Sequence, residues 1–232
     1  ELEMALIELE KDDSISVIVL TGAEHPEKKK AFSVGANLAT IGFATDPPEK
    51  VFETIRRGQK VTCLIEHSDK FIIALVNGFS LGGGLEMCLA CDYIIACEDT
   101  ELGQPEINLG IFPGWGGSQR LPRRIGMAKA LELILTGERI KATEAARIGL
   151  VDKVVPRDKM EETVTELANK ILSKSPLILK IAKQSTRRAQ KTTLEEGLLF
   201  EARSFSACIA TEDGKEGLKA FLEKRKPQFT GK

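Results

Sequence analysis

The 232-residue sequence has few histidines, no excess of charge and no long apolar run. Its two histidines, His25 and His67, leave few imidazoles for a zinc site or for general-base catalysis. Lys and Arg number 33 against 34 Asp and Glu, whereas proteins that bind nucleic acid usually have a basic excess. No apolar run approaches the roughly 18 residues that a membrane helix needs, and no secretory leader is visible. Neither a membrane nor a nucleic-acid partner is therefore expected.

The five cysteines form no disulfide framework, because their number is odd and their spacing is irregular. Cys88 and Cys91 have the spacing of half a zinc or redox motif, but no second pair accompanies them. They lie in an Ala- and Leu-rich helical stretch, where cysteine behaves as a small core residue. We therefore expect buried thiols, no metal site, and a cytoplasmic location, or an organelle matrix if a transit segment has been removed.

Apolar periodicity predicts strands mixed with helices, followed by helices alone. Strands are predicted at 16–20, 71–76, 93–96 and 151–155, with a short apolar segment at 31–36 and no internal repeat. Helices are predicted at 1–11, 49–66, 85–90, 128–135 and 143–148, and then at 160–173, 176–190, 194–208 and 213–225. This order predicts an α/β unit at 1–158 and a C-terminal helical region at 159–232.

The segment Gly78-Phe79-Ser80-Leu81-Gly82 matches the G-x-S-x-G nucleophile elbow and lies between a strand and a helix. In that fold the catalytic histidine follows the serine, but no histidine follows His67. We therefore interpret Ser80 as part of a tight strand-to-helix turn rather than as the nucleophile of a serine hydrolase.

A glycine triplet, 82–84, begins the next helix, where free N–H groups and the helix dipole favour negative charge. It is neither a phosphate loop nor a dinucleotide fingerprint, because the residues that those motifs require do not follow. Glu86 lies in the first helical turn and either complements the dipole or acts as an acid or base. Glu106 lies in a proline-stiffened turn, where an acidic residue is usually only solvated. Two glutamates beside one anion site could divide acid and base roles.

Five ordered segments resemble those of the crotonase, or enoyl-CoA hydratase/isomerase, superfamily. They are residues 31–38 (AFSVGANL), 74–86 (ALVNGFSLGGGLE), 102–106 (LGQPE), 113–122 (PGWGGSQRLP) and 221–229 (FLEKRKPQF). The resemblance covers nearly the whole chain. The family's opening β-hairpin has no matching segment here.

The resemblance implies a crotonase-type α/β spiral of ββα units whose C-terminal helical region mediates trimerisation. It also implies hydration of trans-2-enoyl-CoA without a metal or cofactor, since CoA is part of the substrate, by a homotrimer or a dimer of trimers. Backbone N–H groups of Val34 and Gly83 would form the oxyanion hole. Glu86 and Glu106 would hold a water that the amide of Gly114 helps to position. Implied CoA contacts are Ala31, Gly35, Ala36 and Asn37, with Phe205, Phe221 and Lys224 from a neighbouring subunit.

Two alternatives accompany this interpretation. Having both glutamates favours a hydratase over a Δ3,Δ2-enoyl-CoA isomerase. The second alternative is an RNA-binding member of the fold, because basic residues recur at helical spacing at positions 180, 183, 187, 188 and 191. We prefer a solvated face that meets CoA phosphates or a partner subunit, since acidic residues follow at once and stacking aromatics are lacking. Trp115, where a smaller residue is common in the family, is either a core residue or a pocket wall that restricts acyl length.

Overall fold

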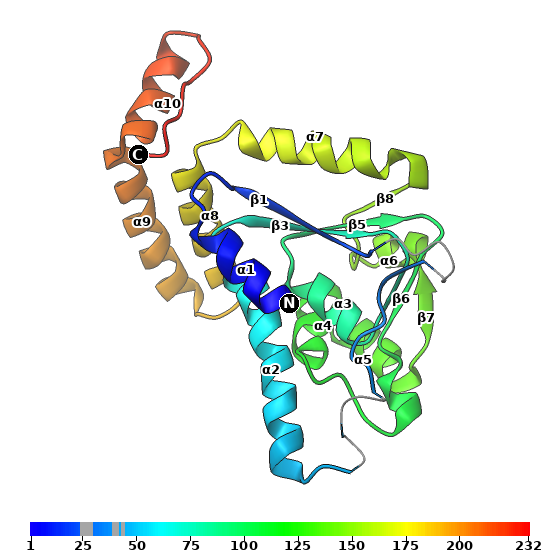
Figure 1. The fold of residues 1–232 in the computed structure, drawn as a ribbon. Coiled ribbons are helices and arrows are strands. Elements are labelled where there is room, and N and C mark those ends of the chain that lie inside the picture. Colours follow the sequence, from blue (N-terminus) through cyan, green and yellow to red (C-terminus); the bar gives the residue numbers. More distant parts are fainter. Residues whose placement is uncertain (24–29, 39–41, 43–44) are drawn as a thin grey trace.

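The computed structural model describes residues 1–23, 30–38, 42 and 45–232, and its strands form two four-stranded sheets (Figure 1). The first sheet is parallel, with the order β1 (Val17–Thr21), β3 (Phe71–Val76), β5 (Tyr93–Cys97), β8 (Lys153–Val155). The second has the order β2 (Ala31–Ser33), β4 (Phe79–Leu81), β6 (Glu101–Gly103), β7 (Arg139–Lys141), with only β7 antiparallel to its neighbour.

Successive ββα units build these sheets. In each unit one strand joins the first sheet, the next joins the second, and a helix leads back: β1-β2-α2 (Pro48–His67), β3-β4-α3 (Gly83–Ala90) and β5-β6-α4 (Gly117–Ile125). Parallel neighbours require such crossovers. The predicted crotonase-type spiral is confirmed, although no sequence repeat indicates it.

The central strands of the first sheet are continuously apolar because helices cover both faces. Ile72 and Ile94 join the main core, whereas Ile73 and Ile95 pack with Met160 on the opposite face. Met160 begins α7 (Met160–Leu172), which lies along the first sheet (Figure 1). The boundary at 158 stays a prediction, and α7 on its C-terminal side shares a core with the sheet.

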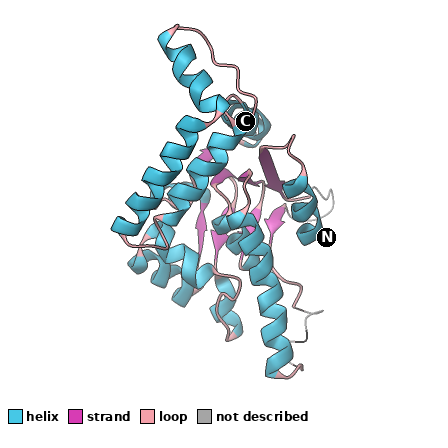
Figure 2. Ribbon diagram, turned by 90° about the vertical axis from the view of Figure 1, so that its left-hand side faces the viewer, coloured by secondary structure: helices cyan, strands magenta, loops and turns pink. Residues whose placement is uncertain are grey.

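The remaining helices follow the predicted order. They are α1 (Leu2–Lys11), α5 (Met127–Thr136), α6 (Ala142–Arg147), α8 (Pro176–Arg188), α9 (Leu194–Ala210) and α10 (Glu212–Leu222). Two 3-10 turns, η1 (Pro105–Leu109) and η2 (Arg157–Lys159), complete the elements described. Thr193 begins α9 with a reciprocal capping box to Glu196. The C-terminal helices gather on one side of the sheets, and α10 extends beyond them (Figure 2).

None of the helices in the described ranges combines the length and the apolar character needed to cross a bilayer.

Candidate active site

Three segments that carry predicted site residues meet at one edge of the second sheet. They follow β2, β4 and β6, which are parallel neighbours, and parallel strands end at a common edge. Leu81 pairs with Gly103, and the N–H of Gly82 extends this ladder by donating to the Gly103 carbonyl at 3.0 Å. The turn after β2 therefore lies beside the start of α3, and the start of α3 lies beside η1.

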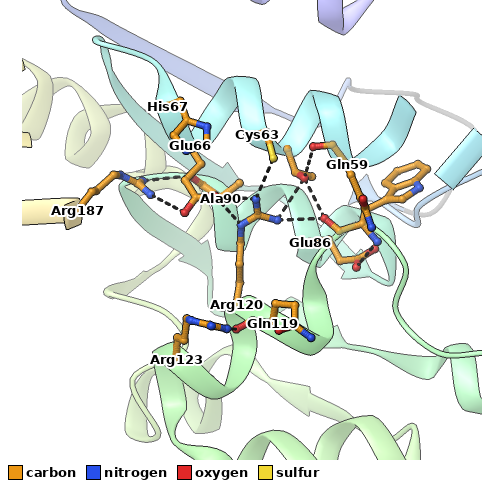
Figure 3. A network of polar contacts seen from close by, with 12 residues as sticks. Gln59, Cys63, Glu66, His67, Glu86, Ala90, Gln119, Arg120, Arg123 and Arg187 are labelled. Atoms are coloured by element: carbon orange, nitrogen blue, oxygen red, sulfur yellow. Dashed lines mark hydrogen bonds and ion pairs between the residues drawn. The ribbon is translucent and has the colours of Figure 1, made fainter. Parts of the chain in front are cut away.

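Glu86 is a buried carboxylate in the first turn of α3, with a 2% exposed side chain. Its Oε1 accepts hydrogen bonds from the backbone N–H groups of Trp115 and Gly117, each at 2.7 Å. Burial raises the pKa of Glu86, while these N–H groups and the charge of Arg120 act in the opposite direction. Figure 3 shows this carboxylate below α2, with Arg120 to one side.

Glu106 lies on η1 and is partly buried. Burial raises its pKa to about 7, and the negative charge of Glu86 adds to this rise. Gln104, fully buried just after β6, has its amide group beside Glu106, and assigning the amide nitrogen to that side puts it 2.9 and 3.1 Å from the two carboxylate oxygens. This orientation is the one that pairs a donor with acceptors. The sequence pattern missed this role of Gln104, although its place two residues before Glu106 is a signal that it could reach the carboxylate.

Glycine backbone forms one wall of the site. Gly82 has φ +53°, and a Cβ added there would lie 2.9 Å from Oε1 of Glu106. Gly35, after β2, has φ +87°, and its added Cβ would lie 2.9 Å from the nitrogen of Gly83. Gly83 begins α3, so its N–H has no acceptor within the helix. Side chains at these two positions would collide with the Glu106 carboxylate and with the start of α3.

The loop between η1 and α4 is held against α2. Gln59 donates to the Gly114 carbonyl at 2.8 Å, and Thr62 donates to the Trp115 carbonyl at 2.9 Å. The indole of Trp115 lies between Gly58 of α2 and Gly83, where an added Cβ would clash with it on either side. Trp115 therefore packs between α2 and the start of α3. Its effect on acyl length stays a prediction.

Comparisons of sequence and structure identify the family of the chain. The family described as enoyl-CoA hydratase/isomerase matches residues 1–232. The chain belongs to this enoyl-CoA hydratase/isomerase family. It is 42% identical to the short-chain-enoyl-CoA hydratase of Clostridium acetobutylicum over 97% of this chain and 84% of that protein. It is 40% identical to the crotonyl-CoA hydratase of Syntrophomonas wolfei over 100% and 87%. The crystal structure of enoyl-CoA hydratase from Bacillus anthracis superposes with a TM-score of 0.92, at 40% identity over 100% of this chain and 87% of that one.

The residues that the family resemblance assigns to CoA fall into two groups. Ala31 lies in β2, and Gly35, Ala36 and Asn37 lie in the turn after it, at the edge that holds the glutamates. The others are Phe205 on α9, Phe221 on α10 and Lys224 just after α10. Both helices extend away from α3 (Figure 1). The chain's own fold does not bring this second group to the carboxylates.

The elbow-like serine and the paired cysteines belong to the core. Ser80 is fully buried in β4, with its Oγ 3.3 Å from the Sγ of Cys88, which confirms that it is no exposed nucleophile. Burial raises the pKa of the Cys88 thiol to about 12. Cys91 is also buried, and its thiol donates to the Met87 carbonyl. Within the described residues no three His, Cys, Asp or Glu side chains are grouped as a metal site would need.

The basic stretch that begins on α8 is only in part the solvated face that the sequence predicts. Lys183 and Arg187 turn inward and share the buried carboxylate of Asp92, at 2.6 and 2.7 Å. Lys180 pairs with Asp69 at 2.5 Å and remains exposed. The prediction is wrong for Lys183 and Arg187, because their partner Asp92 is far away in the sequence.

Proposed function

We propose that this chain is an enoyl-CoA hydratase, which adds water reversibly to trans-2-enoyl-CoA to give 3-hydroxyacyl-CoA. The observation that carries the proposal is the pair Glu86 and Glu106, two carboxylates with different environments that both lie beside the Gly82 backbone. The printed names of the relatives, a short-chain-enoyl-CoA hydratase and a crotonyl-CoA hydratase, support the same reaction. No metal or redox cofactor takes part in the proposed steps.

The two environments suit opposite proton roles. Burial raises the pKa of Glu86, but two backbone N–H groups and the charge of Arg120 stabilise its carboxylate, so Glu86 would take a proton from water as the water oxygen attacks C3. Glu106, with a pKa of about 7, would hold a proton near neutrality and deliver it to C2. The proton gained by Glu86 balances the proton lost by Glu106. The amide of Gly114 would help to position the attacking water.

Attack at C3 moves an electron pair toward the thioester carbonyl, which gains the charge of an enolate. The N–H groups of Val34 and Gly83 would donate to this oxygen. They lie on adjacent segments, since Gly35 approaches the nitrogen of Gly83 closely. Fixed donors of this kind stabilise the transition state more than the ground state, and losing one typically costs about a hundred- to a thousand-fold in rate.

CoA binding would involve two copies of the chain. Ala31, Gly35, Ala36 and Asn37 would line the CoA path within one copy. Several large apolar residues of α9 and α10 are exposed, including Phe221 at 81% and Leu222 at 79%, which is typical of a surface that another copy covers. A homotrimer, or a dimer of trimers, would bring Phe205, Phe221 and Lys224 to a neighbour's CoA. The location, cytoplasm or organelle matrix, stays a prediction.

The test uses crotonyl-CoA and follows loss of absorbance of the conjugated thioester. Glu86→Gln and Glu106→Gln should each slow hydration by about a hundred- to ten-thousand-fold while CoA affinity changes little. Glu132→Gln, at an exposed glutamate that pairs with Lys129 on α5, is the matched control and should keep full activity. Full activity in either site variant would refute the two-carboxylate assignment. Turnover of 3-enoyl-CoA alone would indicate an isomerase, and salt-sensitive RNA binding without turnover would indicate an RNA-binding member.

A further inference from the structure

Arg120 on α4 forms hydrogen bonds to the segment whose backbone N–H groups donate to Glu86. Its Nη1 donates to the Trp115 carbonyl at 3.0 Å and to Oγ1 of Thr62 at 3.2 Å (Figure 3). The side chain is only 14% exposed, so water competes little for these contacts. The backbone of Trp115 therefore contacts both Arg120 and Glu86: its carbonyl accepts from Arg120, and its N–H donates to Glu86 at 2.7 Å.

Arg120 is in turn anchored by Glu66 of α2. Oε2 of Glu66 accepts from Nη2 at 2.7 Å and from Nε at 3.2 Å, a contact that uses the planar fork of the guanidinium. Burial acts to raise the pKa of Glu66, but Arg120 and the other nearby cations hold it below its usual value. Glu66 therefore stays ionised at neutral pH as the counter-ion of Arg120.

The same glutamate connects Arg120 to the C-terminal helical region. Arg187 of α8 approaches Oε1 of Glu66 at 3.7 Å and pairs with Asp92 at 2.7 Å. Figure 3 shows Arg187 and Arg120 on opposite sides of Glu66. The Asp92 side chain is 8% exposed, so this end of the series of ion pairs is also buried.

We propose that Arg120 is the positioning residue of Glu86: it fixes the Trp115 peptide so that the N–H groups of Trp115 and Gly117 converge on one carboxylate oxygen. The Glu66 and Arg187 contacts tie this loop to α8. Arg120 acts through the loop and does not touch the substrate. The kinetic part of the inference rests on the proposed function, whereas the part about loop geometry does not.

The test combines three variants with two measurements. Arg120→Gln removes both the positive charge and the planar guanidinium, whereas Arg120→Lys keeps the charge but not the guanidinium. Arg123→Gln is the control on the same helix. Arg123 donates to the Gln119 carbonyl at its own helix surface, outside the loop. Trp115 is the only tryptophan, so its fluorescence and its quenching by acrylamide report directly on the loop. Hydration of crotonyl-CoA gives kcat, KM and their pH dependence.

Arg120→Gln should make Trp115 more accessible to acrylamide and lower kcat by about ten- to a hundred-fold, the effect of losing a charged hydrogen bond. KM should change by less than about two-fold, because the loss falls on the transition state. Arg120→Lys should restore only part of both properties. Two charged groups act on the carboxylate of Glu86: Arg120 from α4 and Glu106 from η1. Losing the positive charge of Arg120 should raise the pKa of Glu86, so the pH profile of kcat should move to higher pH.

The inference would be overturned if Arg120→Gln keeps the acrylamide quenching and the kcat of the wild type. It would also be overturned if Arg123→Gln changes both properties as much as Arg120→Gln does. If Arg120→Gln does not fold, Glu66→Gln removes the anchor and should raise quenching in the same direction, with unchanged quenching counting against the inference. If the wild-type protein hydrates no enoyl-CoA, the proposed function fails, and the quenching comparison still decides whether Arg120 fixes the loop.

Discussion

Replacing Gly82 with alanine should move the carboxylate of Glu106 without changing any ionisable group. Gly82 joins β4 to α3 with φ +53° and ψ −127°, a backbone conformation that residues other than glycine rarely adopt. The new Cβ would lie 2.9 Å from Oε1 of Glu106, whereas ordinary van der Waals contact begins at 3.4 Å. The carboxylate must therefore withdraw by about 0.5 Å, or the turn must move by a similar amount.

This displacement sets the expected size of the effect. A misplacement of about 1 Å can cost roughly a hundred-fold in rate, so half of that should lower kcat by about ten-fold. The strained backbone should also cost about 1–3 kcal/mol of folding stability. For a chain of this size that loss lowers Tm by roughly 2–4 °C per kcal/mol. The two effects have different origins and can be separated.

Gly126→Ala is the matched control. Gly126, between α4 and α5, has φ +82° and ψ 156°, which also favours glycine, but its added Cβ would meet nothing within 4 Å. Calorimetry should find a lower Tm for both variants, and hydration of crotonyl-CoA should find a lower kcat only for Gly82→Ala. The reasoning is refuted if Gly82→Ala keeps wild-type kcat, or if Gly126→Ala loses as much activity.

Two further predictions concern protonation. Because the proposed reaction requires Glu106 to hold a proton, kcat/KM should fall above about pH 7; a profile that stays flat to high pH would contradict the proposed role of Glu106. Its folded pKa lies above the unfolded value, so the folded state binds more protons and stability to urea should fall as pH rises from that value through about 7. Burial should keep the Cys88 thiol unreactive toward a disulfide reagent until the protein unfolds, while exposed Cys63 reacts at once; rapid labelling of both in the folded protein would count against the buried-thiol interpretation.

The sequence predicts the first sheet well because helices cover both of its faces. Strands such as 71–76 and 93–97 are therefore unbroken apolar runs, and such runs are visible without tertiary information. The long helices are equally visible from their apolar periodicity. The predicted ends differ from the observed ends by only a few residues, as at α10, which ends at Leu222 rather than at 225.

The second sheet is not visible in the same way. Its strands β4, β6 and β7 have three residues each, too few for a period to be recognised. Helix α4 also escapes prediction because it begins at Gly117 and contains Pro122, which both suggest a loop. These elements depend on pairing between neighbouring units of the spiral, so their stability comes from distant residues.

The candidate site shows the same division between local and distant information. Glu86 and Glu106 are recognisable as residues, but their different environments depend on which backbone groups the fold brings to them. The donors to Glu86 are the backbone N–H groups of Trp115 and Gly117. Almost every residue has such a group, so the residue type does not indicate that it donates to Glu86. What the side chains can reveal is the requirement for close approach. At Gly82 a side chain would meet the carboxylate of Glu106. Replacing Gly82 therefore tests the position of that carboxylate, whereas replacing Glu106 removes the carboxylate altogether.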